Sequence, residues 1–321
     1  MRTVAQADDL DTYLREREAL EAGVKPDLAK AILWHDSATR GRTPLSLVYV
    51  HGFSASRKDI SPVVETLGQG LKANVFFTRL AAHGMTSPDA FATVTPQDWL
   101  DDAREALAIG RRIGERTILI GTSTGALLAT VVALEDEPVG FDDELAALQE
   151  RRTARGDGGV APEPSDIAAL VLLSPNFGVR DWRVKFLSGP MGWLLARIVI
   201  GRDYSFHPTN AAHAALWTPR FPSHGIVALM DLVNHARRLP LARLRVPTLV
   251  LYTDNDTVVD VGAIGARFSE IGATRKRLVN VPGATRHELT GAALAPDTVD
   301  TVEREIVKFV ASLGIQPTDP P

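Results

Sequence analysis

The chain of 321 residues contains no cysteine, which excludes disulfide bonds, thiolate metal sites and a cysteine nucleophile. It also lacks a long unbroken apolar run. The longest apolar stretch, residues 186–200, is interrupted by Gly, Pro and Arg197 and falls short of the roughly 20 residues that cross a bilayer. The first 20 residues mix acids with arginines and contain no apolar core of a secretory signal. We therefore expect a cytoplasmic protein with no integral membrane segment.

An excess of charge of one sign is missing as well. The 35 Lys and Arg residues nearly balance the 39 Asp and Glu residues, for a formal net charge of -4. The chain as a whole therefore carries no basic footprint for nucleic acid or for an anionic membrane. The balance does not bear on the oligomeric state, which stays open.

Motifs for cofactors and metals are also lacking. The sequence contains neither a G-x-x-x-x-G-K-[ST] phosphate loop nor a dinucleotide fingerprint. His287 and Glu288 begin like the zinc motif H-E-x-x-H, but Gly291 stands where the second histidine is required. We expect no cofactor and no bound metal.

Apolar residues make up 45% of the chain, which is enough for a large core. Short apolar segments typical of strands alternate with segments of helical spacing. The predicted strands are 31–34, 45–50, 74–79, 117–121, 168–173, 248–253 and 277–281, and the predicted helices include 99–114 and 300–313. This alternation predicts an α/β fold with a mostly parallel, doubly wound sheet and helices on both of its faces.

We assign the core to residues 31–175 and 245–315, with one segment inserted within it and two further segments outside it. Residues 1–30 form an N-terminal helical extension, in which Asp9 to Ala22 read as an amphipathic helix. Residues 136–166 are rich in charged residues, Gly and Pro and read as a polar surface insertion, with a surface helix expected at 141–152.

Residues 176–244 interrupt the alternation and carry three of the five tryptophans. A helical segment inserted between two late strands lies over the strand ends, where ligands bind in such sheets. We expect a helical cap that covers the substrate. Its apolar residues Phe186, Met191, Trp193 and Leu194 either line an acyl pocket or pack against the core, and the sequence does not separate these alternatives.

The pentapeptide Gly121-Thr122-Ser123-Thr124-Gly125 follows an apolar strand and precedes a helix of small residues. In this context G-x-S-x-G places the serine at a sharp turn with its hydroxyl exposed. A strand that turns this tightly into a helix leaves no room for side chains at the flanking positions, which glycine satisfies. Ser123 is therefore the candidate nucleophile.

The strand at 45–50 leads into His51-Gly52-Phe53. A glycine at this turn lets the next backbone N–H point into a site. We expect the Phe53 N–H and the N–H of Thr124, the residue after the nucleophile, to form an oxyanion hole. His51 is expected to be structural and to hold the loop by a hydrogen bond.

A serine nucleophile needs a base, and the base needs an acid that fixes its tautomer. In doubly wound sheets of this kind the chain order is Ser, acid, His. His287 is the one of the eight histidines that follows the acidic loop after the strand at 248–253. Asp254, Asp256 and Asp260 lie near the end of that strand. Asp256 is preferred because Val258 and Val259 can fix its loop to the core, and Asp254 stays the alternative.

Together these residues resemble the α/β-hydrolase superfamily over about residues 45–313. The matching features are H-G-F, G-T-S-T-G, the strand followed by D-N-D-T-V-V, and the late histidine. Residues 79–84, R-L-A-A-H-G, resemble the R-L-x-G-H-G stretch of carboxylesterases and monoacylglycerol lipases, with Ala82 in place of glycine. The resemblance implies Ser123 as nucleophile, His287 as base and Asp256 as acid, with Phe53 and Thr124 as oxyanion donors.

The function expected from these residues is hydrolysis of a small-molecule carboxylic ester through an acyl-enzyme, with short-to-medium acyl esters such as monoacylglycerols as candidates. Two other activities on the same fold stay open: an aminopeptidase and an acyltransferase. A third alternative is a binding protein that has kept the fold without catalysis. The sequence favours an enzyme, because all three triad positions are filled.

Overall fold

The computed structural model describes residues 3–137, 165–181, 187–189 and 191–315. Its main sheet has seven strands in the order β1-β3-β2-β4-β5-β8-β9. All neighbours are parallel except β1 and β3, which are antiparallel. The strands are β1 (Ala31–Leu33), β2 (Thr43–Val50), β3 (Asn74–Phe77), β4 (Gly114–Thr122), β5 (Ile167–Leu173), β8 (Thr248–Tyr252) and β9 (Lys276–Asn280). The predicted fold class is confirmed.

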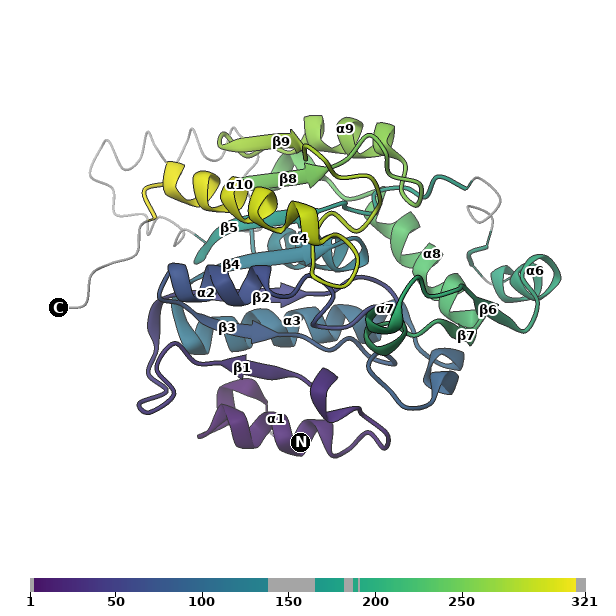
Figure 1. The fold of residues 1–321 in the computed structure, drawn as a ribbon, viewed down its shortest axis with the longest axis horizontal. Coiled ribbons are helices and arrows are strands. Elements are labelled where there is room, and N and C mark those ends of the chain that lie inside the picture. Colours follow the sequence, from purple (N-terminus) through teal and green to yellow (C-terminus); the bar gives the residue numbers. More distant parts are fainter. Residues whose placement is uncertain (1–2, 138–164, 182–186, 190, 316–321) are drawn as a thin grey trace, which may run out of the picture.

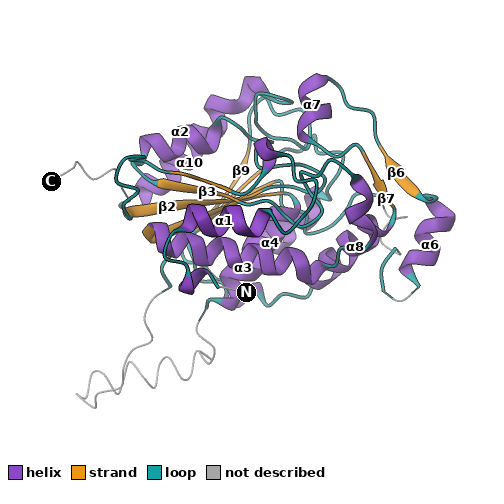
Figure 2. Cartoon of the chain, turned by 90° about the horizontal axis from the view of Figure 1, so that it is seen from below, coloured by secondary structure: helices purple, strands orange, loops and turns teal. Residues whose placement is uncertain are grey.

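Helices cover both faces of this sheet, with α2 and α10 on one side and α3 and α4 on the other (Figure 2). The central strands β2, β4 and β5 are therefore buried on both faces and read as nearly continuous apolar runs. The helices of the core are α2 (Val63–Gly70), α3 (Pro96–Ile113), α4 (Thr124–Glu135), α9 (Val261–Glu270) and α10 (Val299–Ser312). α2 and α9 were not predicted.

The N-terminal extension packs beside β1, at one edge of the sheet (Figure 1). Its helix α1 (Leu10–Glu18) is shorter than predicted, and Leu20 lies beyond it and is exposed. The phenol of Tyr13 donates a hydrogen bond of 2.5 Å to Glu105 on α3. The buried ammonium of Lys30 pairs with the same Glu105 and with Asp102. The extension is thereby fixed to the core by apolar packing and by buried ion pairs.

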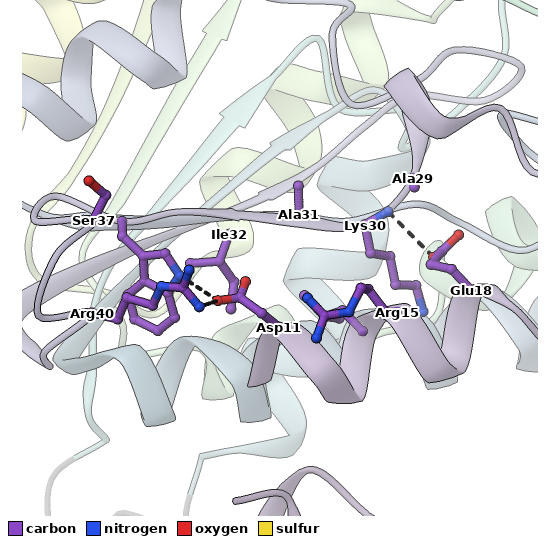
Figure 3. A pocket seen from close by; sticks show the side chains of 11 residues that line it. Asp11, Arg15, Glu18, Ala29, Lys30, Ala31, Ile32, Ser37 and Arg40 are labelled. Carbon is purple, nitrogen blue, oxygen red and sulfur yellow. Dashed lines mark hydrogen bonds and ion pairs between the residues drawn. The ribbon is translucent and has the colours of Figure 1, made fainter. Parts of the chain in front are cut away.

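A surface groove of about 430 Å³ runs between α1 and β1 (Figure 3). Several of its polar side chains already have partners. Asp11 accepts hydrogen bonds from the indole of Trp34 at 3.0 Å and from Arg40 at 2.9 Å. Glu18 binds the Lys30 backbone N–H at 3.4 Å and the buried guanidinium of Arg79 at 2.8 Å. This groove contains no residue of the predicted triad.

The described parts of residues 176–244 follow β5 and precede β8, and they lie beyond the ends of the strands (Figure 1). The segment is not wholly helical, because its two short strands form an antiparallel ribbon of their own. Its elements are α6 (Gly192–Val199), β6 (Asp203–Ser205), α7 (Ala211–Leu216), β7 (Arg220–Pro222) and α8 (His224–Ala236).

The polar insertion at 136–166 is described only at its ends, and the surface helix predicted at 141–152 lies outside the described residues. The two ends are held together because Arg111 pairs with Asp136 at 2.5 Å and with Asp166 at 2.8 Å. No helix in the described part of the chain is both long enough and apolar enough to cross a membrane.

Candidate active site

Ser123 lies in the sharp turn between β4 and α4 and has φ 53° and ψ −112°. A positive φ in a non-glycine residue is sterically costly and is typical of a strained functional turn. The glycines on either side allow the close approach. A Cβ at Gly125 would lie 2.0 Å from the backbone oxygen of Val50, and a Cβ at Gly121 would lie 2.5 Å from the backbone oxygen of Gly125. The sharp turn and the close approach expected of G-x-S-x-G are present, whereas Ser123 is buried, with 7% of its surface exposed, where the sequence predicted an exposed hydroxyl.

The side chains of Ser123, His287 and Asp256 form a continuous hydrogen-bonded chain. The Nε2 atom of His287 lies 2.9 Å from the Ser123 Oγ, and the His287 Nδ1 lies 2.7 Å from an Asp256 Oδ. The three residues follow β4, β9 and β8, so they meet at the carboxyl edge of the sheet. The Asp256 carboxylate accepts a hydrogen bond from the His287 Nδ1–H. In a neutral imidazole the proton therefore resides on Nδ1, and Nε2 is left to accept from the serine hydroxyl.

The loop that carries His287 is fixed from two neighbouring strand ends. The hydroxyl of Ser174, which follows β5, donates to the backbone oxygen of His287 at 2.9 Å. The hydroxyl of Thr253, which follows β8, donates to the backbone oxygen of Ala284 at 2.7 Å, and the amide of Asn255 binds the same oxygen at 3.0 Å. These bonds hold the imidazole in register with the serine.

Burial and pairing act in opposite directions on the pKa values of His287 and Asp256. Burial alone would lower the pKa of His287, but the hydrogen bond and negative charge of Asp256 raise it above the ordinary value. Burial alone would raise the pKa of Asp256, but His287 and two backbone N–H groups lower it. The pair therefore favours an ionised aspartate and a strongly basic imidazole.

Of the three candidate acids, only Asp256 contacts His287. Asp254 is exposed and accepts a hydrogen bond from Asn280, and Asp260 caps the N-terminus of α9. The prediction that Val258 and Val259 both fix the Asp256 loop to the core was wrong for one of them. Val259 is buried, but Val258 is 48% exposed, and the carboxylate is aimed by the backbone N–H groups of both valines, at 2.8 and 2.9 Å.

The H-G-F turn lies directly beside the nucleophile. A Cβ at Gly52 would lie 3.6 Å from the Cβ of Ser123. Within the described residues, the backbone N–H groups of Phe53 and Thr124 donate to no acceptor. The Phe53 ring is held edge-on against four other rings, those of His83, Phe91, Trp99 and Phe221. The turn therefore presents a free backbone donor from a rigid position next to Ser123.

Two buried histidines fix this turn. His51 binds the backbone oxygen of Gly52 through Nδ1 at 2.8 Å and accepts from the Leu80 N–H through Nε2 at 3.1 Å. His83 accepts from the Ser54 N–H at 2.9 Å. Burial lowers the pKa of His51 to about 4, so its imidazole is neutral and can act as an acceptor. The structural role expected for His51 is confirmed.

Sequence reasoning missed Asp59, a buried acid beneath the turn. Its carboxyl group accepts from the phenol of Tyr49 and from the backbone N–H of Gly52 at 3.3 Å. The same phenol oxygen accepts from the Thr122 hydroxyl at 3.0 Å, which connects Asp59 with the residue before the nucleophile. Burial raises the pKa of Asp59 to about 7. Its position in the sequence, seven residues after Gly52, gave no signal of these contacts.

The described apolar residues for which the sequence left open an acyl pocket or core packing lie at the protein surface. Met191, Trp193 and Leu194 are 64%, 54% and 41% exposed on and beside α6, so they neither pack against the core nor form a closed pocket. Phe186 lies outside the described residues. Core packing is therefore wrong for these three side chains, and the acyl pocket stays a prediction.

Comparisons with known proteins agree with the fold. The model of the alpha/beta hydrolase family matches residues 47–299. A search of curated protein sequences found no relative. Among solved structures, one from the metagenome-derived lipolytic enzymes LipS and LipT has 17% identity and a TM-score of 0.63, and covers 90% of this chain and 99% of its own.

Two further similar structures are monoacylglycerol lipases. The enzyme from Paleococcus ferrophilus has 17% identity and a TM-score of 0.56, with 89% of this chain and 99% of its own covered. The soluble variant of the monoglyceride lipase from Saccharomyces cerevisiae has 14% identity and a TM-score of 0.59, with 89% and 91% covered. At such identities the likeness shows the fold alone. Since the family model spans well over half of the chain, and extends from β2 to beyond His287, the protein belongs to the alpha/beta hydrolase family.

Proposed function

We propose that the protein is a serine hydrolase that cleaves carboxylic esters through an acyl-enzyme. The observation that carries the proposal is the continuous chain from the Ser123 hydroxyl through His287 to Asp256, with separations of 2.9 and 2.7 Å. These are the residue types and contacts that turn an unreactive hydroxyl into a nucleophile.

In the first half of the reaction the Ser123 Oγ attacks the ester carbonyl carbon while its proton passes to the His287 Nε2. The resulting imidazolium is stabilised by the ionised carboxylate of Asp256. The tetrahedral intermediate then collapses, the bond to the alcohol oxygen breaks, and His287 returns the proton to the leaving alcohol. In the second half a water molecule repeats these steps against the acyl group on Ser123 and releases the acid.

The backbone N–H groups of Phe53 and Thr124 are proposed to stabilise the negative oxygen of both intermediates. The support is their lack of any other acceptor among the described residues and the position of the H-G-F turn beside Ser123. Donors held in place before the reaction act strongly because they need no reorganisation when charge develops. His51, His83 and Asp59 supply that rigidity.

We propose short-to-medium acyl esters, monoacylglycerols included, as the substrate class. The support is indirect: the similar solved structures are described as lipolytic enzymes and monoacylglycerol lipases. Residues 176–244 are proposed to act as a cap, because they lie beyond the carboxyl edge of the sheet where Ser123 and His287 meet.

Covalent labelling combined with a substrate panel tests the proposal. A fluorophosphonate should modify Ser123 stoichiometrically, as read by peptide mass spectrometry, and p-nitrophenyl esters of increasing acyl length should be hydrolysed in preference to aminoacyl amides. A preference for the amides would instead support the aminopeptidase, and transfer of the acyl group to an added alcohol in preference to water would support the acyltransferase. An unlabelled Ser123 with no turnover would contradict hydrolysis and leave the binding protein.

The pH profile of kcat/KM is expected to depend on the pairing of His287 with Asp256. Only the neutral imidazole can accept the serine proton, so kcat/KM should rise with pH through an inflection above the ordinary value of about 6.5. In Asp256→Asn the interactions that raise the pKa are lost and burial remains. The inflection should therefore move to lower pH, and the rate should fall by about three to four orders of magnitude.

Asp254→Asn is the matched control, because this neighbouring carboxylate is exposed and contacts Asn280 instead of the imidazole. It should change neither the inflection nor the rate. Equal effects of the two substitutions on a soluble ester would contradict the assignment of Asp256 as the acid.

A further inference from the structure

Helix α6 in the inserted segment is packed with its small residues inward. Its buried residues are Gly192 and Ala196, and a Cβ at Gly192 would lie 3.1 Å from a methyl group of Val227 on α8. The large apolar residues point away from the protein. Six of the eleven exposed large apolar side chains of the described residues belong to this one short stretch: Met191, Trp193, Leu194, Leu195, Ile198 and Val199.

Helical spacing arranges these side chains in rows on the outer surface. Leu194 and Ile198 are separated by four residues and form one row, and Trp193 and Arg197 form the adjacent row. Figures 1 and 2 place α6 at the outer end of the inserted segment, away from the sheet. A monomeric protein rarely exposes such a continuous apolar face unless the face binds something.

The surroundings of this face are basic, although the chain as a whole is acidic. Residues 187–224 contain three arginines and a single acid, Asp203, which pairs with Arg220 at 2.7 Å. Arg197 and Arg202 have no carboxylate partner in the part of the chain that the structure describes. Two unpaired guanidinium groups therefore lie at the border of the apolar face.

The same arginines line a surface pocket of about 390 Å³ next to α6, together with Trp193, Ser223 and His224. Two acids, Asp203 and Asp89, also line the pocket. Asp203 pairs with Arg220, and Asp89 accepts a hydrogen bond from the Ser87 hydroxyl at 2.9 Å. Guanidinium groups match the geometry of phosphate oxygens. The pocket thus offers a place for a phosphate group directly beside side chains that prefer an acyl environment.

We propose that α6 is a docking surface for an anionic phospholipid layer, with its apolar rows inserted among the acyl chains and Arg197 and Arg202 at the phosphates. A helix with Trp and aliphatic residues on the outside and arginines at the border is suited to lie in the membrane interface. A second copy of the chain fits this face less well. A two-fold contact would bring Arg197 towards its own copy, and residues 187–199 contain no acid to pair with it.

Flotation of the full chain with phosphatidylcholine vesicles, with and without phosphatidylglycerol, tests the proposal. The chain should bind the anionic vesicles, and added salt should weaken binding. Ile198→Asp should reduce binding about tenfold to a hundredfold. An aliphatic side chain that inserts among the acyl chains is replaced by a carboxylate, which the anionic lipids repel. Arg197→Glu should reduce it about fivefold or more on anionic vesicles, with a smaller effect on neutral ones.

The matched control is Leu20→Asp, which places the same charge at a side chain that is 61% exposed and follows α1, a helix remote from α6 in Figure 1. It should bind like the unaltered chain. Tryptophan emission should shift to shorter wavelength on binding, and Trp193→Phe should abolish most of that shift. Ser123→Ala should still bind, and Ile198→Asp should still hydrolyse a soluble short-chain ester, so the docking test does not depend on the proposed activity.

Three results would overturn the proposal. The first is the absence of binding to anionic vesicles. The second is binding that Ile198→Asp leaves intact. The third is a dimer of the unaltered chain in sedimentation velocity that Ile198→Asp converts to a monomer, because the face would then be occupied by a second copy.

Discussion

Ser123→Ala should lower kcat for a p-nitrophenyl ester by about four to six orders of magnitude while KM changes little. The hydroxyl is the proposed attacking group, since the His287 Nε2 lies 2.9 Å from it and is held there by Asp256. Without it, the remaining donors can still bind and polarise the carbonyl, which accounts for a residual rate above that of water. Steady-state kinetics and fluorophosphonate labelling on the same preparations measure the effect.

Two controls accompany this variant. Its thermal unfolding should match that of the unaltered chain, because the removed oxygen has only His287 as a side-chain partner. Ser269→Ala, on the exposed face of α9, should keep full activity and full labelling at Ser123. If Ser123→Ala retained a tenth or more of the activity, another nucleophile would be required and the proposed mechanism would be wrong.

The sheet was predictable because most of its strands carry their own signal. β2, β4, β5 and β8 are buried on both faces, so each reads as an apolar run that ends in Gly, Ser or Asp. Strand direction at the edge was not predictable from such runs. β1 has only three residues, and it pairs antiparallel with β3 at the edge where the N-terminal extension packs.

Elements without a strong pattern were missed for physical reasons. α2 contains Gly68 and Gly70, and α9 contains Gly262 and Gly265, which weaken the helical signal in both segments. The strands β6 and β7 are three residues long, and their ribbon depends on pairs such as Ser205 with Arg220, which are fifteen residues apart in the sequence. β7 also packs against the 3-10 helix η3 (Pro88–Ala92), so contacts between distant segments, not local preference, decide the ribbon.

Within the site, the G-x-S-x-G motif selected Ser123 and chain order selected His287, because the fold fixes which strand end each must follow. The choice between Asp254 and Asp256 required coordinates. The two residues are close in the same loop, but the Asp256 carboxylate contacts His287 whereas that of Asp254 contacts Asn280. The support beneath the H-G-F turn was also out of reach. Asp59 and His83 act through contacts with Gly52 and Ser54 that no spacing rule encodes.

Net charge was the least informative of the sequence observations. A value of -4 for the whole chain gave no indication of anionic lipid as a partner. It averages acidic residues on the core with an inserted segment in which arginines outnumber acids three to one over residues 187–224. Only the structure shows that the unpaired arginines lie beside outward-facing Trp193 and its aliphatic neighbours.

Gly125→Ala should destabilise the fold by about 3 kcal/mol or more, although it adds only one methyl group. The new Cβ would lie 2.0 Å from the backbone oxygen of Val50 and 2.5 Å from that of His51, and neither oxygen can rotate away as a side chain can. To relieve the clash, α4 must move away from β2 and carry the Ser123 turn with it. Any folded fraction should therefore also lose activity.

Gly265→Ala is the control for this effect, because a Cβ there meets nothing within 4 Å on α9. It should stabilise the chain by up to about 1 kcal/mol, since alanine is the better helix former. Chemical denaturation of both variants, with kcat on a soluble ester, provides the comparison. If Gly125→Ala unfolded at the same midpoint as the unaltered chain, steric closeness of α4 and β2 would not be what requires glycine in this motif.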